Sequence, residues 1–266
     1  MKPKVNIANV IVNQPVLLDR KWAEGHILSS AKAETVSEDG EHKEKVLADV
    51  YMTYGNVGII SISGVIVNGF VPEEDCDYTD VSLVESALQI LRGDPDIASI
   101  WLVVDSPGGF VSGIKGLADL INEVDKEKPT YCWIYGCAFS AAYWLASQCR
   151  YIYTDADGMA GSIGDYMITV DRTKELAQAG VELNIFSAGE GKLAGNSVYS
   201  LSEEDKKHFQ SVIDKTYAQF IEHIDRKRKV DHANAKAYTW DAEESVRLGL
   251  VDGLYPSFVS AVQATL

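Results

Sequence analysis

Two short segments rich in serine and glycine could carry nucleophilic chemistry. Asp-Ser-Pro-Gly-Gly at 105–109 follows the apolar run 99–104 and precedes a helical pattern. Its glycines can present backbone N–H groups to an anion or an oxyanion. Ser140 lies between a strand-like run and a stretch of small residues, where its hydroxyl could be exposed at a helix N-terminus. Taken singly, a tight strand-to-helix turn and an N-cap serine explain the two segments equally well.

A nucleophilic Ser140 would need a base, and the sequence offers few histidines for that role. No Gly-x-Ser-x-Gly pattern occurs, and no histidine lies between His42 and His208. A Ser-His-Asp triad therefore has few candidates for its base. Another kind of group would have to deprotonate Ser140.

Four segments in order resemble the motifs of the signal peptide peptidase A family of serine peptidases. They are Ser-Pro-Gly-Gly at 106–109, Ala-Phe-Ser-Ala-Ala-Tyr-Trp-Leu-Ala at 138–146, Gly-Ser-Ile-Gly at 161–164 and Ser-Ala-Gly-Glu-Gly-Lys-Leu-Ala-Gly at 187–195. The similarity runs from about residue 57 to 254. Its version at 140–147 resembles the branch of tailed-phage and prophage head maturation, or capsid assembly, proteases. This resemblance implies an α/β fold of the ClpP/crotonase type, with repeated βαβ units and a mainly parallel sheet.

The resemblance also implies a catalytic Ser-Lys dyad. Ser140 would be the nucleophile, Lys192 the general base, and Ser162 the residue that orients the lysine. The oxyanion would accept hydrogen bonds from backbone N–H groups, those of Gly108 or Gly109 and of Ala141. A lysine can act as a base only where burial or neighbouring cations destabilise its ammonium form, and the small residues around Lys192 would allow close packing over the serine.

One residue departs from the family pattern. Asp165 directly follows Gly-Ser-Ile-Gly, where the family usually has an apolar residue. A carboxylate near the dyad would favour the charged lysine and weaken it as a base. We therefore expect either that Asp165 points away from the dyad or that the activity is greatest at higher pH.

The elements that position these residues alternate between strands and helices. Strands are expected at 57–62, 99–104, 130–135, 151–154 and 183–186, and helices after the N-cap Asp80, through 117–124, after Ser140 and over 203–228. Such alternation predicts a parallel sheet whose ligands bind at the carboxyl ends of the strands. Apolar spacing at 15–28 predicts an N-terminal helix, and the polar stretch 29–45 a mobile linker. The expected division is an extension at 1–50 and a protease domain at 51–266.

Composition excludes several partners. The formal net charge is -15, which disfavours nucleic acid and anionic membrane surfaces. The basic run 226–229 is therefore interpreted as the solvated end of a helix. The sequence has neither a signal peptide pattern nor 18 consecutive apolar residues, so no membrane contact is expected, and the predicted location is the bacterial host cytoplasm or the procapsid interior. The four cysteines form no zinc-type spacing, which predicts reduced thiols, no metal and no cofactor.

These observations favour a serine endopeptidase that cleaves scaffold or capsid proteins during phage head maturation. It would act as a homo-oligomer on protein or peptide substrates, with the stretch 29–45 as a tether or a self-cleavage site. Three alternatives stay open. They are a cytoplasmic peptidase that degrades proteins in a bacterium, a crotonase-type enzyme acting on acyl-CoA, and a structural minor capsid or scaffold-binding protein without turnover.

Overall fold

Three long strands that carry a single charged residue, Asp105, form the centre of the sheet. The computed structural model describes residues 4–5, 16–18, 46–72 and 77–265. These three strands run parallel in the order β4, β7, β8. They comprise β4 (Val57–Val67), β7 (Ser99–Phe110) and β8 (Thr130–Phe139). Buried residues follow one another almost without a break along β7 and the first half of β8, which is the pattern of strands covered on both faces.

Shorter strands extend this sheet on both sides. The described residues form a ten-stranded sheet, in which β3 and β11 join at the two ends of the main path as antiparallel strands. The remaining strands of this sheet are β2 (Val16–Leu18), β3 (Tyr51–Tyr54), β6 (Tyr78–Asp80), β9 (Tyr151–Thr154), β10 (Met159–Gly161), β11 (Thr239–Trp240) and β12 (Gly253–Leu254). A separate parallel pair joins β1 (Lys4–Val5) and β5 (Val71–Pro72).

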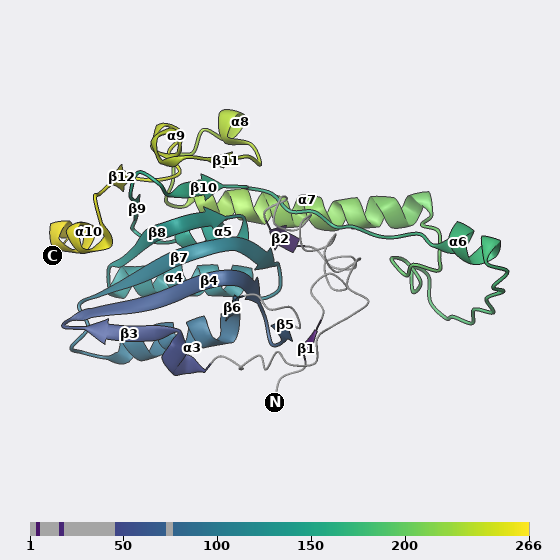
Figure 1. Cartoon of the computed structure of the whole chain (residues 1–266), viewed down its shortest axis with the longest axis horizontal. Coiled ribbons are helices and arrows are strands. Elements are labelled where there is room, and N and C mark those ends of the chain that lie inside the picture. Colours follow the sequence, from purple (N-terminus) through teal and green to yellow (C-terminus); the bar gives the residue numbers. More distant parts are fainter. Residues whose placement is uncertain (1–3, 6–15, 19–45, 73–76, 266) are drawn as a thin grey trace.

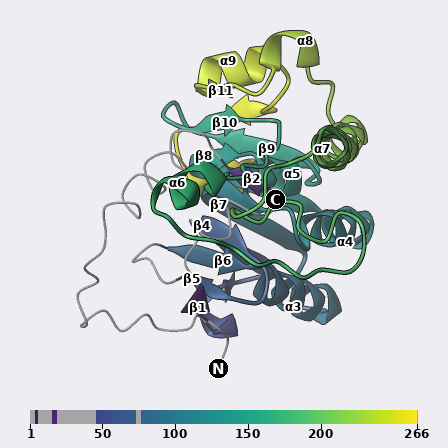
Figure 2. The same cartoon turned by 90° about the vertical axis from the view of Figure 1, so that its right-hand side faces the viewer.

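The helices α3 (Val81–Gly93), α4 (Ile114–Glu127) and α7 (Glu203–Asp225) cover one face of the sheet, and each lies in the connection between two strands. The Asp80 carboxylate accepts a hydrogen bond from the Ser82 N–H and so begins α3 as the sequence predicts. Figure 2 shows α3, α4 and α7 along the same side of the sheet. The helices are α3 (Val81–Gly93), α4 (Ile114–Glu127), α5 (Ala141–Ala146), α6 (Thr173–Gln178), α7 (Glu203–Asp225), α8 (His232–Ala235), α9 (Ala242–Arg247) and α10 (Phe258–Thr265), with a 3-10 turn η1 (Leu47–Asp49) before β3.

The main core lies between the sheet and these helices, and an aromatic cluster lies on the opposite face. Side chains of a strand alternate between faces, so Leu102 packs in the main core while Trp101 faces the other way. There Trp101 stacks on Tyr131 and meets Phe258 of α10 edge to face. The C-terminal helix α10 therefore covers this part of the second face.

The structure differs from the sequence prediction at two of the expected elements. Of the predicted helix at 15–28, residues 16–18 are described, and they form strand β2, so the prediction is wrong there. Backbone pairing with β7 replaces the helical bonds that the local pattern favours. The expected strand at 183–186 is irregular and exposed. The rest of 15–28 and the expected linker at 29–45 lie outside the described residues, and the division at residue 50 stays a prediction.

The interpretation of the basic run 226–229 as a solvated helix end is wrong for Lys227 and Arg228, whereas Arg226 and Lys229 are exposed just after the end of α7. Arg226 pairs with Asp119, Lys227 with Asp125 and the buried Arg228 with Asp252. Acidic residues on other elements draw Lys227 and Arg228 inward, and this long-range pairing is invisible in a local pattern.

Two further expectations concern the state of the cysteines and the presence of a helix that could span a membrane. Cys132, Cys137 and Cys149 are thiols rather than disulfide partners, and Cys76 lies outside the described residues. Burial raises the pKa of the Cys149 thiol to about 12. Every helix in the described part of the chain is too short or too polar to cross a lipid bilayer.

Candidate active site

The register of β7 and β8 brings the two serine and glycine segments together. Ser106 of β7 pairs with Ala138 of β8. Gly108 and Ser140 each lie two residues further along these neighbouring parallel strands, so they leave the pair at the same level. The expected meeting of the loops at the carboxyl ends of the strands is therefore present.

Ser140 has a backbone conformation that few residues with side chains adopt. Its φ is 54° and its ψ is -118°, at the point where β8 ends and α5 begins. Among the described residues, three that are not glycine have positive φ, and Ser140 and Ser162 are two of them. Such conformations cost about 1 to 3 kcal/mol each and cluster at functional sites. The two serines directly follow a pair of residues on neighbouring strands, because Phe139 of β8 pairs with Gly161 of β10.

Contacts from the β10 segment hold Ser140 in this conformation. Its N–H donates to the Gly161 carbonyl at 2.9 Å, and its Oγ donates to the Gly164 carbonyl at 3.1 Å. The Ser140 side chain is fully buried within the single chain. The neighbouring Ser162 is also buried, and its N–H donates to the Tyr238 carbonyl at 2.7 Å.

The three backbone groups predicted to form an oxyanion hole differ in their present partners. Ala141 is the first residue of α5, so its N–H has no acceptor within the helix. The Gly108 N–H donates to the Ser106 hydroxyl at 3.1 Å, and an oxyanion would have to replace that acceptor. A Cβ on Gly109 would lie 2.0 Å from the Ile66 carbonyl oxygen, so glycine is needed there for close approach to β4.

Lys192 does not reach Ser140 in the single chain. It is exposed in a segment of turns, and no hydrogen bond or ion pair joins it to Ser140 or Ser162 in the part of the chain that the structure describes. Figure 1 shows the segment between β10 and α7, which includes α6, extending beyond the sheet along α7.

Two contacts on α7 show how far the loop of Lys192 lies from the helix that begins at Ser140. A Cβ on Gly195, three residues after Lys192, would lie 3.4 Å from the Phe209 ring near the start of α7. Helix α5, which begins at Ser140, contacts α7 at Phe220, because Trp144 stacks there with ring centroids 4.6 Å apart. Phe209 and Phe220 are separated by about 16 Å along the axis at 1.5 Å per residue. The loop of Lys192 and the helix of Ser140 therefore lie at different places along α7.

The extended segment between β10 and α7, residues 162–202, exposes many apolar side chains. Those exposed by more than a third are Ile168, Val170, Val181, Leu183, Ile185 and Phe186. Phe186 is 94% exposed. Apolar residues gathered on one exposed segment are typical of a surface that binds another protein.

Asp165 lies next to the carbonyl that binds the nucleophile, and its carboxyl group is buried. Both carboxylate oxygens have no hydrogen-bond partner within the described chain. Burial raises the pKa of Asp165 to about 7, and the charge of Asp214 on α7 adds to the effect. Asp165 thus directly follows the Gly164 carbonyl that accepts the hydrogen bond from Ser140, in a setting that favours the neutral form of its carboxyl group below about pH 7.

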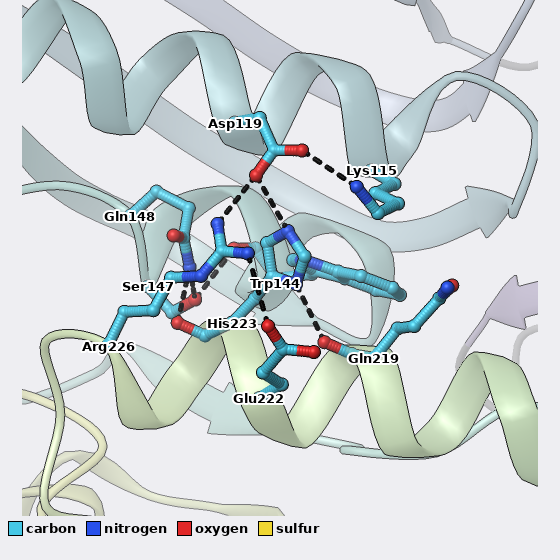
Figure 3. Close-up of polar contacts among 9 residues, drawn as sticks. All are labelled: Lys115, Asp119, Trp144, Ser147, Gln148, Gln219, Glu222, His223 and Arg226. Carbon is cyan, nitrogen blue, oxygen red and sulfur yellow. Dashed lines mark hydrogen bonds and ion pairs between the residues drawn. The ribbon is translucent and has the colours of Figure 1, made fainter.

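A polar cluster behind the nucleophile was not predicted from the sequence (Figure 3). The buried His223 on α7 lies 3.1 Å from the Asp119 carboxylate of α4 through Nε2, and 2.7 Å from the Gln219 carbonyl through Nδ1. Both ring nitrogens therefore lie within hydrogen-bond distance of an oxygen atom. Arg226 also donates to Asp119, at 2.5 Å.

This cluster fixes α7 against α4 and α5. Burial alone would raise the pKa of Asp119, but hydrogen bonds from Arg226 and Lys115 outweigh burial and hold it at about 2. The His223 ring also meets the ring of Trp144 at 5.2 Å. His223 and Asp119 are 104 residues apart in the sequence, so no local pattern could have indicated that they pair.

Comparison with known proteins adds a family and a fold. A family model described as peptidase family S49 matches residues 122–263. The chain is 29% identical over 213 residues to the head-tail preconnector protein GP5 of Enterobacteria phage P21, covering 78% of this chain and 42% of that protein. It is 24% identical over 277 residues to the capsid assembly protease C of Escherichia phage lambda, covering 95% of this chain and 63% of that protein. The chain thus spans less than two thirds of either relative.

The fold also resembles a solved structure. An enoyl-CoA hydratase from Shewanella pealeana superposes with a TM-score of 0.50 at 12% identity, covering 81% of this chain and 71% of that one. At such low identity the likeness concerns the fold alone. Together with the mainly parallel sheet, it confirms the predicted ClpP/crotonase-like α/β fold.

Proposed function

This chain belongs to peptidase family S49, and from that premise we propose that it is a serine endopeptidase that forms an acyl-enzyme on Ser140. The observation that carries the proposal is the geometry of Ser140. It has a strained backbone, lies level with Gly108 and directly precedes the N–H groups of α5. Strain of this kind persists only where surrounding contacts impose it, and it commonly accompanies a nucleophile.

The proposed reaction has two halves. The Ser140 Oγ attacks the substrate carbonyl carbon, its proton passes to the base, and the negative charge on the oxygen is stabilised by backbone N–H groups that include that of Ala141. The amine leaves with a proton from the protonated base, and water then hydrolyses the ester and restores the serine hydroxyl. We assign the base to Lys192 and its orientation to Ser162.

We propose further that Lys192 is delivered by a second copy of the chain. Within one chain the two residues lie at different places along α7, and a lysine must be desolvated to act as a base. The exposed apolar residues of the segment 162–202 support an intermolecular contact that would bury it. A homo-oligomer is therefore part of the proposed active form.

The proposed substrates are scaffold or capsid proteins of an assembling phage head. Support comes from the two phage relatives, which are a capsid assembly protease and a head-tail preconnector protein. The net charge of -15 is consistent with a protein rather than a nucleic acid substrate.

The test is covalent labelling by a fluorophosphonate probe, read by intact mass and peptide mapping. We expect labelling at Ser140 in the wild type and none in Ser140→Ala. Lys192→Ala should lose labelling, whereas Lys174→Ala, an exposed lysine on the same extended segment, should retain it. Circular dichroism and thermal unfolding establish that each variant is folded.

A second candidate function is a structural capsid role without turnover. The separation of Lys192 from Ser140 in the single chain favours it. Absence of labelling between neutral and alkaline pH, in folded and assembled protein, would contradict the peptidase and support this alternative.

A further inference from the structure

Strand β2 pairs with the part of β7 that lies beside the nucleophile. The pairing is antiparallel, with Val16 opposite Phe110, Leu17 opposite Gly109 and Leu18 opposite Gly108. Figure 1 shows β2 at the carboxyl end of β7. A segment from the N-terminal part of the chain therefore lies at the predicted oxyanion glycines.

The side of β7 on which β2 lies follows from the other pairings. At the same level, Gly108 pairs with Val65 and Gly109 with Ile66 of β4, so one edge of β7 is occupied. The other edge carries β8 only as far as the pair of Ser106 with Ala138. Beyond it β8 ends and turns at Ser140 into α5, which leaves this edge open for β2.

This edge is suited to an extended peptide. A peptide that adds to an open strand edge gains main-chain hydrogen bonds whatever its side chains are. Strand β2 runs antiparallel to β7, and in this register Leu18 is the residue that pairs with Gly108. Gly108 is itself level with Ser140, because both lie two residues beyond the pair of Ser106 and Ala138.

We propose that β2 occupies the place of the substrate strand, and that this chain is its own first substrate, cut after Leu18. The inference rests on the proposed function of Ser140 and extends it to a specific peptide. The Ser140 Oγ attacks the Leu18 carbonyl carbon, the bond from that carbon to the next backbone nitrogen breaks, and the new amine takes a proton. Water then hydrolyses the Leu18 ester, which gives a Leu18 carboxylate and the free serine.

Until the cut is made, β2 also excludes other peptides from the same edge. Only one strand can pair with the open edge of β7 at 108–110, so a substrate in trans has to displace β2 or wait for its removal. Self-cleavage would therefore precede cleavage of other proteins.

The test compares the full-length wild type with Ser140→Ala after incubation under conditions that allow assembly. Intact mass and N-terminal sequencing should find wild-type protein that begins at residue 19, together with the peptide 1–18. Ser140→Ala should retain residues 1–18. A cut within 29–45, or at any other place than after Leu18, would overturn the assigned register.

A paired variant separates β2 from the chemistry at Ser140. Leu17→Pro with Leu18→Pro removes two N–H donors and disfavours strand pairing, so the cut should be lost while fluorophosphonate labelling of Ser140 persists. In the Ser140→Ala background, the same two substitutions should increase hydrogen exchange at 108–110. Ile27→Pro, placed outside β2, is the matched control and should still be cut.

The outcomes distinguish this inference from the proposed function. Labelling of Ser140 without a cut after Leu18 would overturn the self-cleavage and leave the peptidase standing. Unchanged hydrogen exchange at 108–110 in the proline variant would overturn the placement of β2. The absence of both labelling and cutting would contradict both proposals.

Discussion

Trp144 stacks on Phe220 with the two rings 8° from parallel, and this contact joins the helix that follows the nucleophile to the long helix α7. Both side chains are fully or almost fully buried. Because α5 has only six residues, its position depends on packing rather than on its own hydrogen bonds. The contact therefore links the stability of the core to the placement of Ser140.

Removal of this contact should destabilise the protein and displace the nucleophile. We expect Phe220→Ala to lower the free energy of unfolding by about 3 to 5 kcal/mol, the usual cost of truncating a buried phenylalanine. Urea unfolding measures this change, and the rate of probe labelling reports on Ser140. Tyr217→Ala, on the same helix but 41% exposed, is the control and should have a much smaller effect. Equal losses in the two variants would contradict the special role of the stacked pair.

The glycine that allows β4 to approach β7 should tolerate no side chain. A methyl group at Gly109 would lie 2.0 Å from the Ile66 carbonyl oxygen, so the strands would have to separate. We expect Gly109→Ala to reduce labelling of Ser140 by about 10²-fold or more, which is the typical loss when one oxyanion donor is removed. Gly116→Ala on α4, where a Cβ meets nothing within 4 Å, should be neutral or slightly stabilising. Normal labelling of Gly109→Ala would show that this close approach does not matter for the site.

Asp165 should make stability decrease as pH rises. Burial raises its pKa to about 7, so between its ordinary value near 4 and pH 7 the folded chain binds more protons than the unfolded chain. The free energy of unfolding should therefore fall over this interval and level off above it. We expect Asp165→Asn to remove a decline of about 1 to 2 kcal/mol, a value reduced for solvent screening of a partly buried carboxyl.

The measurement for Asp165 is urea unfolding at several pH values from 4 to 8, with Asp214→Asn as a second variant. Removal of the Asp214 charge should lower the pKa of Asp165 and shift the decline to lower pH. The same decline in Asp165→Asn and in the wild type would assign it to another group.

Mixing two inactive variants tests whether the dyad forms between copies. If Lys192 acts on the Ser140 of a neighbouring chain, Ser140→Ala mixed with Lys192→Ala should regain labelling, and the label should be found only on the Lys192→Ala chain. Dissociation and reassembly of the mixture, followed by intact mass, provides this measurement. Continued absence of labelling in a mixture shown to exchange subunits would assign the base to the same chain or to another residue.

Much of the local structure could be predicted from the sequence. Strand β9 begins and ends where the sequence predicted a short strand at 151–154, and Asp80 begins its helix through a side-chain hydrogen bond. These features depend on neighbours within a few residues. The predictions failed where distant groups decide, as in Val16–Leu18, which pairs with β7, and in Arg228, which is drawn into the core by Asp252.

The sequence by itself determined where the candidate residues of the proposed chemistry lie in the chain, because the order of the four motifs and the position of Ser140 between a strand and a helix are local properties. Only the tertiary structure decided which of these residues meet. Strand register places Ser140 level with Gly108, helix packing along α7 holds the loop of Lys192 away, and an open strand edge receives β2. Register and packing depend on contacts between segments far apart in the chain, and for that reason no local pattern could specify them.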